Sequence, residues 1–272
     1  MHAADLLGET SGSVTPSAET PQRLVVAWQH PIQRSIEPVG FLTFDGHSYR
    51  FGYIRNVLSV VDFRPLLGFP DLHGSYESTE LFPLFAQRAM DPRRPDYQRY
   101  VESLGLEGEP GPLEQITRSE GRRQGDTIQL LPEPVAVGDE ISYLFLVHGI
   151  RHAHEDPRIL HGQPIHVTAQ QVEDALASLR GGDELLLAAE PSNPANPLAL
   201  MVVGSEAPIG WVPNLLAEDI QRLIHHTPVQ ILVEHVNGPD APWHLRLLAR
   251  LRAPSAGDFK FFTDEQWQPL AQ

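Results

Sequence analysis

The chain reads YLFLVHGIRH over residues 143–152, GDELLLAAEPSNPANPLALMVV over residues 182–203 and APIGWVPNLLAEDI over residues 207–220. Two apolar runs in the second block, Glu184–Ala189 and Leu198–Val203, have the length and composition of strands. The rest of the expected fold is organised around these blocks. They predict a small β scaffold whose connecting loops face a ligand.

The connection between the two runs, EPSNPANP over residues 190–197, contains three prolines. Proline fixes φ and lacks a backbone N–H, so this connection can be neither a helix nor a central strand. Each residue before a proline is also restricted to extended conformations. We therefore expect a stiff loop that presents the side chains of Asn193 and Asn196.

A second turn, PIGWVP over residues 208–213, places Trp211 directly after Gly210. Glycine has no side chain and allows another group to approach its backbone closely. We expect this turn to contribute an aromatic surface beside the proline loop.

Composition limits the possible functions. The chain has 272 residues, 41% hydrophobic and 20% charged, with a formal net charge of −15, which fits a globular protein and argues against broad nonspecific binding to nucleic acid or anionic membranes. It has no cysteine, which excludes disulfides, zinc–thiolate sites, iron–sulfur clusters and cysteine nucleophiles. The N-terminus lacks the pattern of a secretory signal, and no apolar run is long enough to span a membrane, so we expect a cytoplasmic protein.

The pattern of turns and periodic segments predicts an α+β fold in four parts. These are a leader over residues 1–20, an α+β module over residues 21–131, a β domain over residues 132–252 and a tail over residues 253–272. In the module, Asp45-Gly46 between alternating segments predicts a hairpin over residues 37–51, and residues 78–90 predict a helix capped by Ser78 or Thr79. In the β domain, residues 167–179 predict a helix capped by Thr168, and residues 228–235 and 243–251 predict strands.

Three blocks of the β domain resemble a HIRAN domain. They are GIRH at 149–152, EPSNPANPLA at 190–199 and IGWVP at 209–213, and the likeness covers residues 139–252. The resemblance implies an OB-like or SH3-like β-barrel, here with a helical insert over residues 161–180. It also implies binding of single-stranded DNA through a pocket for the 3′-hydroxyl end.

The resemblance also implies the residues of that pocket. Arg151 and His152 occupy the arginine and aromatic positions of the first block. Asn193 matches the asparagine of the proline loop, whereas Asn196 replaces an aspartate with a neutral amide. Trp211 occupies a position that is often histidine, and Trp243 matches a late aromatic.

Each of these residues also has a purely structural interpretation. Arg151 either pairs with a phosphate or forms a surface ion pair with Glu155 or Asp156. Asn193 either contacts a nucleotide or bonds to its own loop backbone as an Asx turn. Trp211 either stacks on a base or closes the core, and for Trp243 the core position is the more common outcome.

The first half resembles, over residues 21–106, the small N-terminal subdomain of HipA-type toxin kinases. The likeness rests on VGFLTFDGHSYRFGYIRNVL at 39–58 and LFPLFAQRAM at 81–90. No glycine-rich phosphate loop or magnesium-binding aspartate motif follows, so phosphotransfer is not implied.

Five histidines lie close together in the sequence, namely His148, His152, His154, His161 and His166. They lack a recognised ligand spacing such as HExxH, and we expect no metal, no cofactor and no catalytic residue.

We therefore predict a non-enzymatic protein that binds single-stranded DNA or a DNA 3′ end and contacts a protein partner through its N-terminal module. The alternative is an interaction or antitoxin-like component of a toxin–antitoxin or defence system without DNA binding. The charge balance favours this alternative, because residues 139–252 contain seven arginines and fourteen acidic residues.

Overall fold

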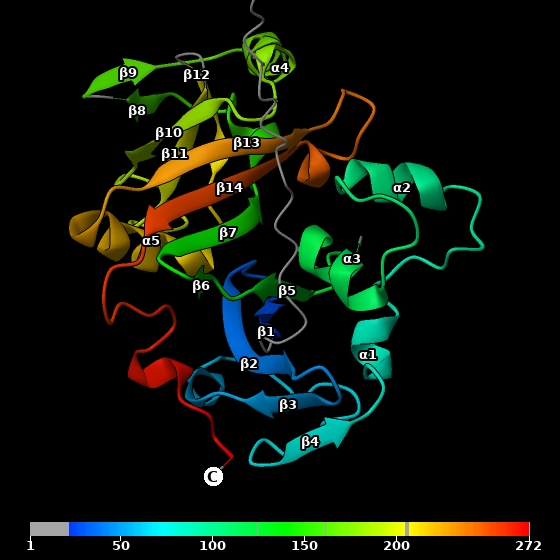
Figure 1. Cartoon of the computed structure of the whole chain (residues 1–272). Coiled ribbons are helices and arrows are strands. Elements are labelled where there is room, and N and C mark those ends of the chain that lie inside the picture. Colours follow the sequence, from blue (N-terminus) through cyan, green and yellow to red (C-terminus); the bar gives the residue numbers. More distant parts are fainter. Residues whose placement is uncertain (1–21, 124, 161, 205–206, 272) are drawn as a thin grey trace, which may run out of the picture.

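The computed structural model describes residues 22–123, 125–160, 162–204 and 207–271. The leader predicted over residues 1–20 lies outside these ranges. Within them the chain is a mixed structure of antiparallel sheets and few helices, consistent with the expected α+β class. Figure 1 shows a smaller sheet from the first half below a larger sheet from the second half.

The first sheet has five antiparallel strands in the order β4 (Ser75–Ser78), β3 (Tyr49–Tyr53), β2 (Ile36–Phe44), β1 (Gln22–Gln29) and β5 (Ile128–Pro132). The hairpin predicted from Asp45-Gly46 is confirmed and joins β2 to β3. Asp45 Oδ1 accepts hydrogen bonds from the backbone N–H groups of His47 at 2.9 Å and Ser48 at 2.8 Å. Gly46 takes a φ of 94°, which only glycine adopts freely.

Three α-helices follow one another along one side of the molecule (Figure 1). They are α1 (Pro83–Ala86), α2 (Tyr97–Ser103) and α3 (Pro112–Ser119), and a 3-10 helix, η1 (Arg55–Leu58), follows β3. Helix α1 lies beside the first sheet and α2 beside the second. The helix predicted over residues 78–90 is wrong in its start, because Ser78 ends strand β4 and pairs with Tyr49. The helix begins at Pro83 instead, where the missing N–H of proline does no harm.

The second sheet has seven antiparallel strands. Their order is β12 (Ala207–Trp211), β11 (Leu200–Gly204), β10 (Glu184–Ala189), β13 (Gln230–Val236), β14 (Leu247–Pro254), β7 (Glu140–Leu146) and β6 (Val135–Val137). A single bridge between His148 and Trp211 connects β12 to the chain that follows β7. This bridge is isolated and belongs to no strand ladder, so the described strands form no closed barrel and the predicted OB-like or SH3-like barrel is not confirmed.

The insert between the first two blocks forms a hairpin and a helix. The hairpin consists of β8 (Arg158–Leu160) and β9 (Gln163–Ile165), and the helix is α4 (Ala169–Ser178). The predicted cap is confirmed, because Thr168 and Gln171 form a reciprocal capping box. The helix α5 (Asn214–His226) follows β12 and begins after Pro213.

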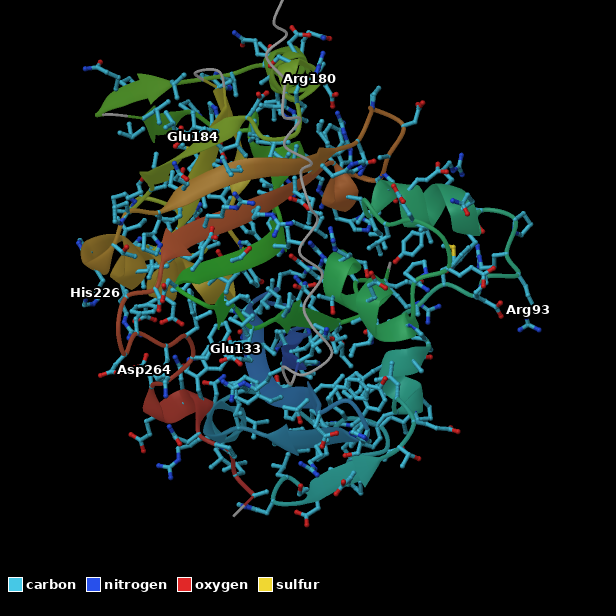
Figure 2. The ribbon with its side chains drawn as sticks, viewed as in Figure 1. Arg93, Glu133, Arg180, Glu184, His226 and Asp264 are labelled. Atoms are coloured by element: carbon cyan, nitrogen blue, oxygen red, sulfur yellow. The ribbon has the colours of Figure 1, made fainter. Side chains whose placement is uncertain are left out.

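The two halves share buried side chains. Val25 and Phe41 of the first sheet belong to the same core cluster as the inner face of the second sheet. The tail packs across this junction, since Trp267 of the 3-10 helix η4 (Glu265–Trp267) stacks on Phe41 with 6.0 Å between ring centroids. Arg23 of β1 pairs with Glu133, which lies between the two sheets (Figure 2).

Candidate nucleic-acid interface

The GIRH block forms a 3-10 helix, η2 (Ile150–His152), that projects its polar side chains outward. Gly149 precedes it with a φ of 68°, and a Cβ atom there would lie 2.6 Å from Cε3 of Trp211. Glycine is therefore required both by the backbone conformation and by the close approach of the indole. The turn buries Ile150 and leaves Arg151 exposed.

Arg151 and His152 are joined in a hydrogen-bonded chain that ends on Glu155. Arg151 Nε donates to His152 Nε2 at 2.8 Å, and His152 Nδ1 lies 2.8 Å from Glu155 Oε1. An arginine nitrogen can only donate, so His152 Nε2 accepts and Nδ1 donates to Glu155. This bond to His152 lowers the pKa of the Glu155 carboxyl. Within the described residues Arg151 forms no ion pair with Glu155 or Asp156, so its terminal N–H groups face solvent.

The proline loop uses the side chains of both asparagines for its own structure. Asn193 Oδ1 accepts from the backbone N–H groups of Ala195 at 3.0 Å and Asn196 at 3.3 Å, which is the Asx-turn alternative. Asn196 Oδ1 accepts from the N–H of Leu198 at 2.9 Å. These bonds fix the shape of the loop without an external ligand.

A buried carboxylate that the sequence analysis did not select lies at the centre of this region. Glu190 is 2% exposed, and its Oε2 accepts from Trp211 Nε1 at 2.6 Å and from Asn193 Nδ2 at 2.7 Å. Its Oε1 lies 3.3 Å from Arg158 Nη1. A buried carboxylate requires this set of donors, because an unpaired buried charge is strongly unfavourable.

Arg158 links the proline loop to the GIRH block. Its guanidinium lies over the ring of Trp211 at 5.0 Å from the centroid, and its Nη2 donates to the carbonyl of His152 at 3.3 Å. Arg158 comes from strand β8 in the insert. The sequence offered one signal for Glu190, because it is a charged residue directly after an apolar strand. No local pattern indicated that Arg158 would be its partner.

The two tryptophans differ in exposure. Trp211 is 9% exposed, with Arg158 over its ring, Gly149 against its edge and its N–H on Glu190. Of the two interpretations left open for Trp211, this burial favours the core position. Trp243, expected in the core, is 43% exposed.

Trp243 also does not begin a strand as predicted. It begins a 3-10 helix, η3 (Trp243–Leu245), that follows Pro242, and β14 starts only at Leu247. The helix η3 lies beside η2, the helix that carries Arg151 and His152. The guanidinium of Arg246 lies 5.3 Å from the Trp243 ring centroid and is itself fixed by two 2.7 Å bonds to Glu173.

Arg122 of the first half lies near His244 of η3. Burial lowers the pKa of His244, and the neighbouring positive charge of Arg122 lowers it further. Beneath them, His148 Nε2 lies 2.6 Å from an oxygen of Glu120, a residue at the end of α3 that is 1% exposed. The face therefore combines arginine, imidazole and an exposed indole on a protein that is acidic overall.

The six predicted site residues thus fall into three groups. Arg151 and His152 lie on η2, and Trp243 lies on the neighbouring helix η3. Asn193 and Trp211 lie behind them as donors to Glu190. Asn196 lies in a separate hollow that is also lined by Glu218 and Asp264.

In the part of the chain that the structure describes, no group of three or more histidine, aspartate or glutamate side chains could hold a metal ion. His161, one of the five clustered histidines, lies outside the described residues. None of the described helices combines the length and apolar character needed to cross a bilayer.

Comparison with known proteins gives limited similarity. No protein-family model matches the chain, and no curated protein matches it. A protein of Lactobacillus plantarum solved by structural genomics is 16% identical with a TM-score of 0.30, covering 42% of this chain and 96% of that chain. The HIRAN domain of human HLTF is 12% identical with a TM-score of 0.29, covering 43% of this chain and 78% of that chain. Neither comparison supports the predicted HipA-like first half, and scores this low establish neither a shared fold nor a shared function.

Proposed function

We propose that the face formed by η2 and η3 binds single-stranded nucleic acid, with the DNA 3′ end implied by the HIRAN-like blocks as its preferred ligand. One observation carries this proposal. Arg151 and Trp243 are both exposed on adjacent short helices, although they are 92 positions apart in sequence (243 − 151). A guanidinium and an exposed aromatic ring on neighbouring helices match the chemistry of a nucleotide, which offers a phosphate and a base.

Each residue has a distinct role in this proposal. Arg151 pairs with a backbone phosphate through its free terminal N–H groups, and Trp243 stacks on a base. His152 orients Arg151 through the 2.8 Å bond between them. Asn193 and Trp211 hold the supporting structure through Glu190, and Asn196 takes no direct part.

We infer a binding role without catalysis. The hydrogen-bonded chain from Glu155 through His152 ends on the guanidinium of Arg151, which has no nucleophilic atom. An acid–base relay would need a reactive group at that end.

Fluorescence anisotropy with labelled single strands of about 12 nucleotides, a length typical of single-strand sites, tests the proposal. We expect Arg151→Ala to weaken binding about tenfold and Trp243→Ala to remove about 1–3 kcal/mol of binding free energy.

The control is Arg93→Ala, which changes the net charge equally but lies at the outer edge of the molecule (Figure 2). A strand with a free 3′-hydroxyl should bind more tightly than the same strand ending in a 3′-phosphate. Equal and negligible binding by all variants would exclude the function.

A second candidate function is protein interaction through the first half, within a toxin–antitoxin or defence system. The observation that favours it is the exposure of three large apolar side chains at or next to one hollow, Ile32 at 84%, Leu58 at 61% and Val61 at 63%. A pull-down with the full chain tests this candidate. It is favoured over the first if a specific protein partner is recovered and added DNA does not change the recovery.

A further inference from the structure

Two adjoining hollows run along the start of strand β2, away from η2 and η3. The first has a volume of about 110 Å³ and is lined by His30 and Val61, among others. The second has a volume of about 210 Å³ and is lined by Asn196, Leu198 and Asp264, among others. Glu37 lines both hollows, so the two are neighbours on the surface, and together they are called the groove below.

His30 at the wall of the first hollow carries an unused hydrogen-bond donor. Its Nδ1 accepts from the backbone N–H groups of Ile32 and Gln33, each at 3.1 Å, so the proton of the neutral ring is on Nε2. The residue is 4% exposed, and Nε2 has no hydrogen-bond partner. The nearest carboxylate oxygen, Asp62 Oδ2, lies 3.6 Å away, which is beyond hydrogen-bond range.

The backbone around the first hollow is strained. Arg34 and Asp62 have φ values of 64° and 58°, in the left-handed region that residues with side chains seldom adopt. Such residues occur preferentially at ligand-binding sites, where the surrounding structure holds them in place. Here they flank the hollow on both sides, one in the turn after β1 and one in the loop after η1.

The rim of the first hollow is apolar and open to solvent. Val61 lines it, and Ile32 and Leu58 directly precede two other lining residues, Gln33 and Ser59. All three apolar side chains are more than half exposed. Large apolar side chains gathered at the edge of a hollow are typical of a surface that a partner covers.

The second hollow is acidic. Glu37, Glu218 and Asp264 line it, and these carboxylates form no ion pair among the described residues. A fourth carboxylate in this lining, Asp219, pairs with Arg222 at 2.6 Å and accepts a hydrogen bond from the backbone N–H of Phe262 at 2.9 Å. Burial raises the pKa of Asp219, and the neighbouring charges of Asp264 and Glu218 raise it further.

The remaining chemistry of the groove fits a peptide backbone. Leu198 is 37% exposed at the second hollow, and the amide side chains of Asn196 and Gln266 lie beside it. We propose that this groove binds an extended segment of a partner protein, with a bulky apolar side chain over Val61 and basic side chains over Glu37, Glu218 and Asp264. The proposal deepens the second candidate function and rests on it, and it does not depend on nucleic-acid binding.

A labelled synthetic peptide of leucine followed by lysines tests the proposal with the full chain. We expect Glu37→Gln to weaken its binding about threefold to fivefold, as expected for a solvent-screened ion pair. The matched control is Glu80→Gln, which removes an exposed carboxylate outside both hollows. Val61→Ser should also weaken binding, whereas Leu67→Ser, at a residue that is 85% exposed and lines neither hollow, should not.

Two further measurements separate this site from general charge attraction. In a long-range ¹H–¹⁵N spectrum, the Nε2 resonance of His30 should shift when the peptide binds, because the peptide would cover the hollow that His30 lines. Glu37→Gln should leave anisotropy with single-stranded DNA unchanged, so the two proposed functions can fail independently. Three results would overturn the proposal. A peptide with glutamates in place of lysines binds as tightly as the lysine peptide, a peptide of residues 1–21 binds more tightly than it, or the Nε2 resonance of His30 does not shift on binding.

Discussion

The indole N–H of Trp211 donates to Oε2 of Glu190 at 2.6 Å, and this bond ties strand β12 to the start of the proline loop. The same carboxylate holds Asn193 and pairs with Arg158, which in turn holds the backbone of η2. The three HIRAN-like blocks are therefore connected through one buried charge. A substitution of Glu190 should therefore disturb the structure of the proline loop, β12 and η2 together.

Glu190→Gln should destabilise the protein by about 2–4 kcal/mol, because it leaves the guanidinium of Arg158 without a compensating charge in a buried position. Arg158 has a side chain that is 11% exposed. Denaturant unfolding followed by tryptophan fluorescence measures the change. The control is Glu184→Gln, an exposed carboxylate on β10, for which we expect a change of less than about 0.5 kcal/mol. A similar small change for Glu190→Gln would contradict the central role assigned to this carboxylate.

Trp211→Phe tests the bond itself. It keeps an aromatic ring against Gly149 and removes the N–H donor to Glu190, which should cost about 1–3 kcal/mol. In a double-mutant cycle with Glu190→Gln, the two losses should not add, because Glu190→Gln removes the charge that strengthens the bond whose donor Trp211→Phe removes. Additive losses would show that the two residues act separately.

The sequence predicted those features that depend on local chemistry. The Asp45-Gly46 hairpin and the Thr168 cap both rest on residues within three positions of each other, and both are confirmed. The resemblance singled out Arg151 and His152, and the structure places them on one exposed turn. Local sequence chemistry could not predict whether the second sheet closes into a barrel, because closure depends on pairing between β7 and β12, which are far apart in the chain.

The rest depended on contacts between distant residues. Glu190 and Arg158 are 32 positions apart, and no local pattern predicts that they meet. The sequence left Trp211 open between core and surface and favoured the core for Trp243, which is exposed, because the packing of neighbouring segments decides which indole is covered. The acidic hollow around Asn196 combines residues from β2, α5 and the tail, so the sequence could not separate Asn196 from the predicted nucleic-acid site.

Gly149→Ala should destabilise the protein more than a typical substitution of a glycine with positive φ. A Cβ atom at Gly149 would lie 2.6 Å from the Trp211 ring, whereas Gly108 has a similar φ of 67° and open space around it. Gly108→Ala should cost about 1–2 kcal/mol through backbone conformation alone. Gly149→Ala should cost about 1–3 kcal/mol more through overpacking against the indole. Thermal unfolding of both variants measures the difference, and equal losses would contradict the close approach seen here.

Stability should fall on acidification partly because of Glu120. Burial alone would raise the pKa of its carboxyl, but the charge and hydrogen bond of His148 outweigh burial, and the pKa is lowered from 4.5. A group whose pKa is lower in the folded state stabilises the fold above its unfolded pKa, and this contribution is lost as the pH falls through the folded pKa.

Glu120→Gln should therefore be less stable than the original chain at pH 7. Below about pH 4.5 its stability should fall less steeply, because the linked proton uptake is gone. Unfolding free energies measured from pH 7 down to acid, with Glu102→Gln as the exposed control, test both points. A parallel loss of stability in Glu120→Gln and the original chain would show that the pair of Glu120 and His148 is not the source of the acid sensitivity.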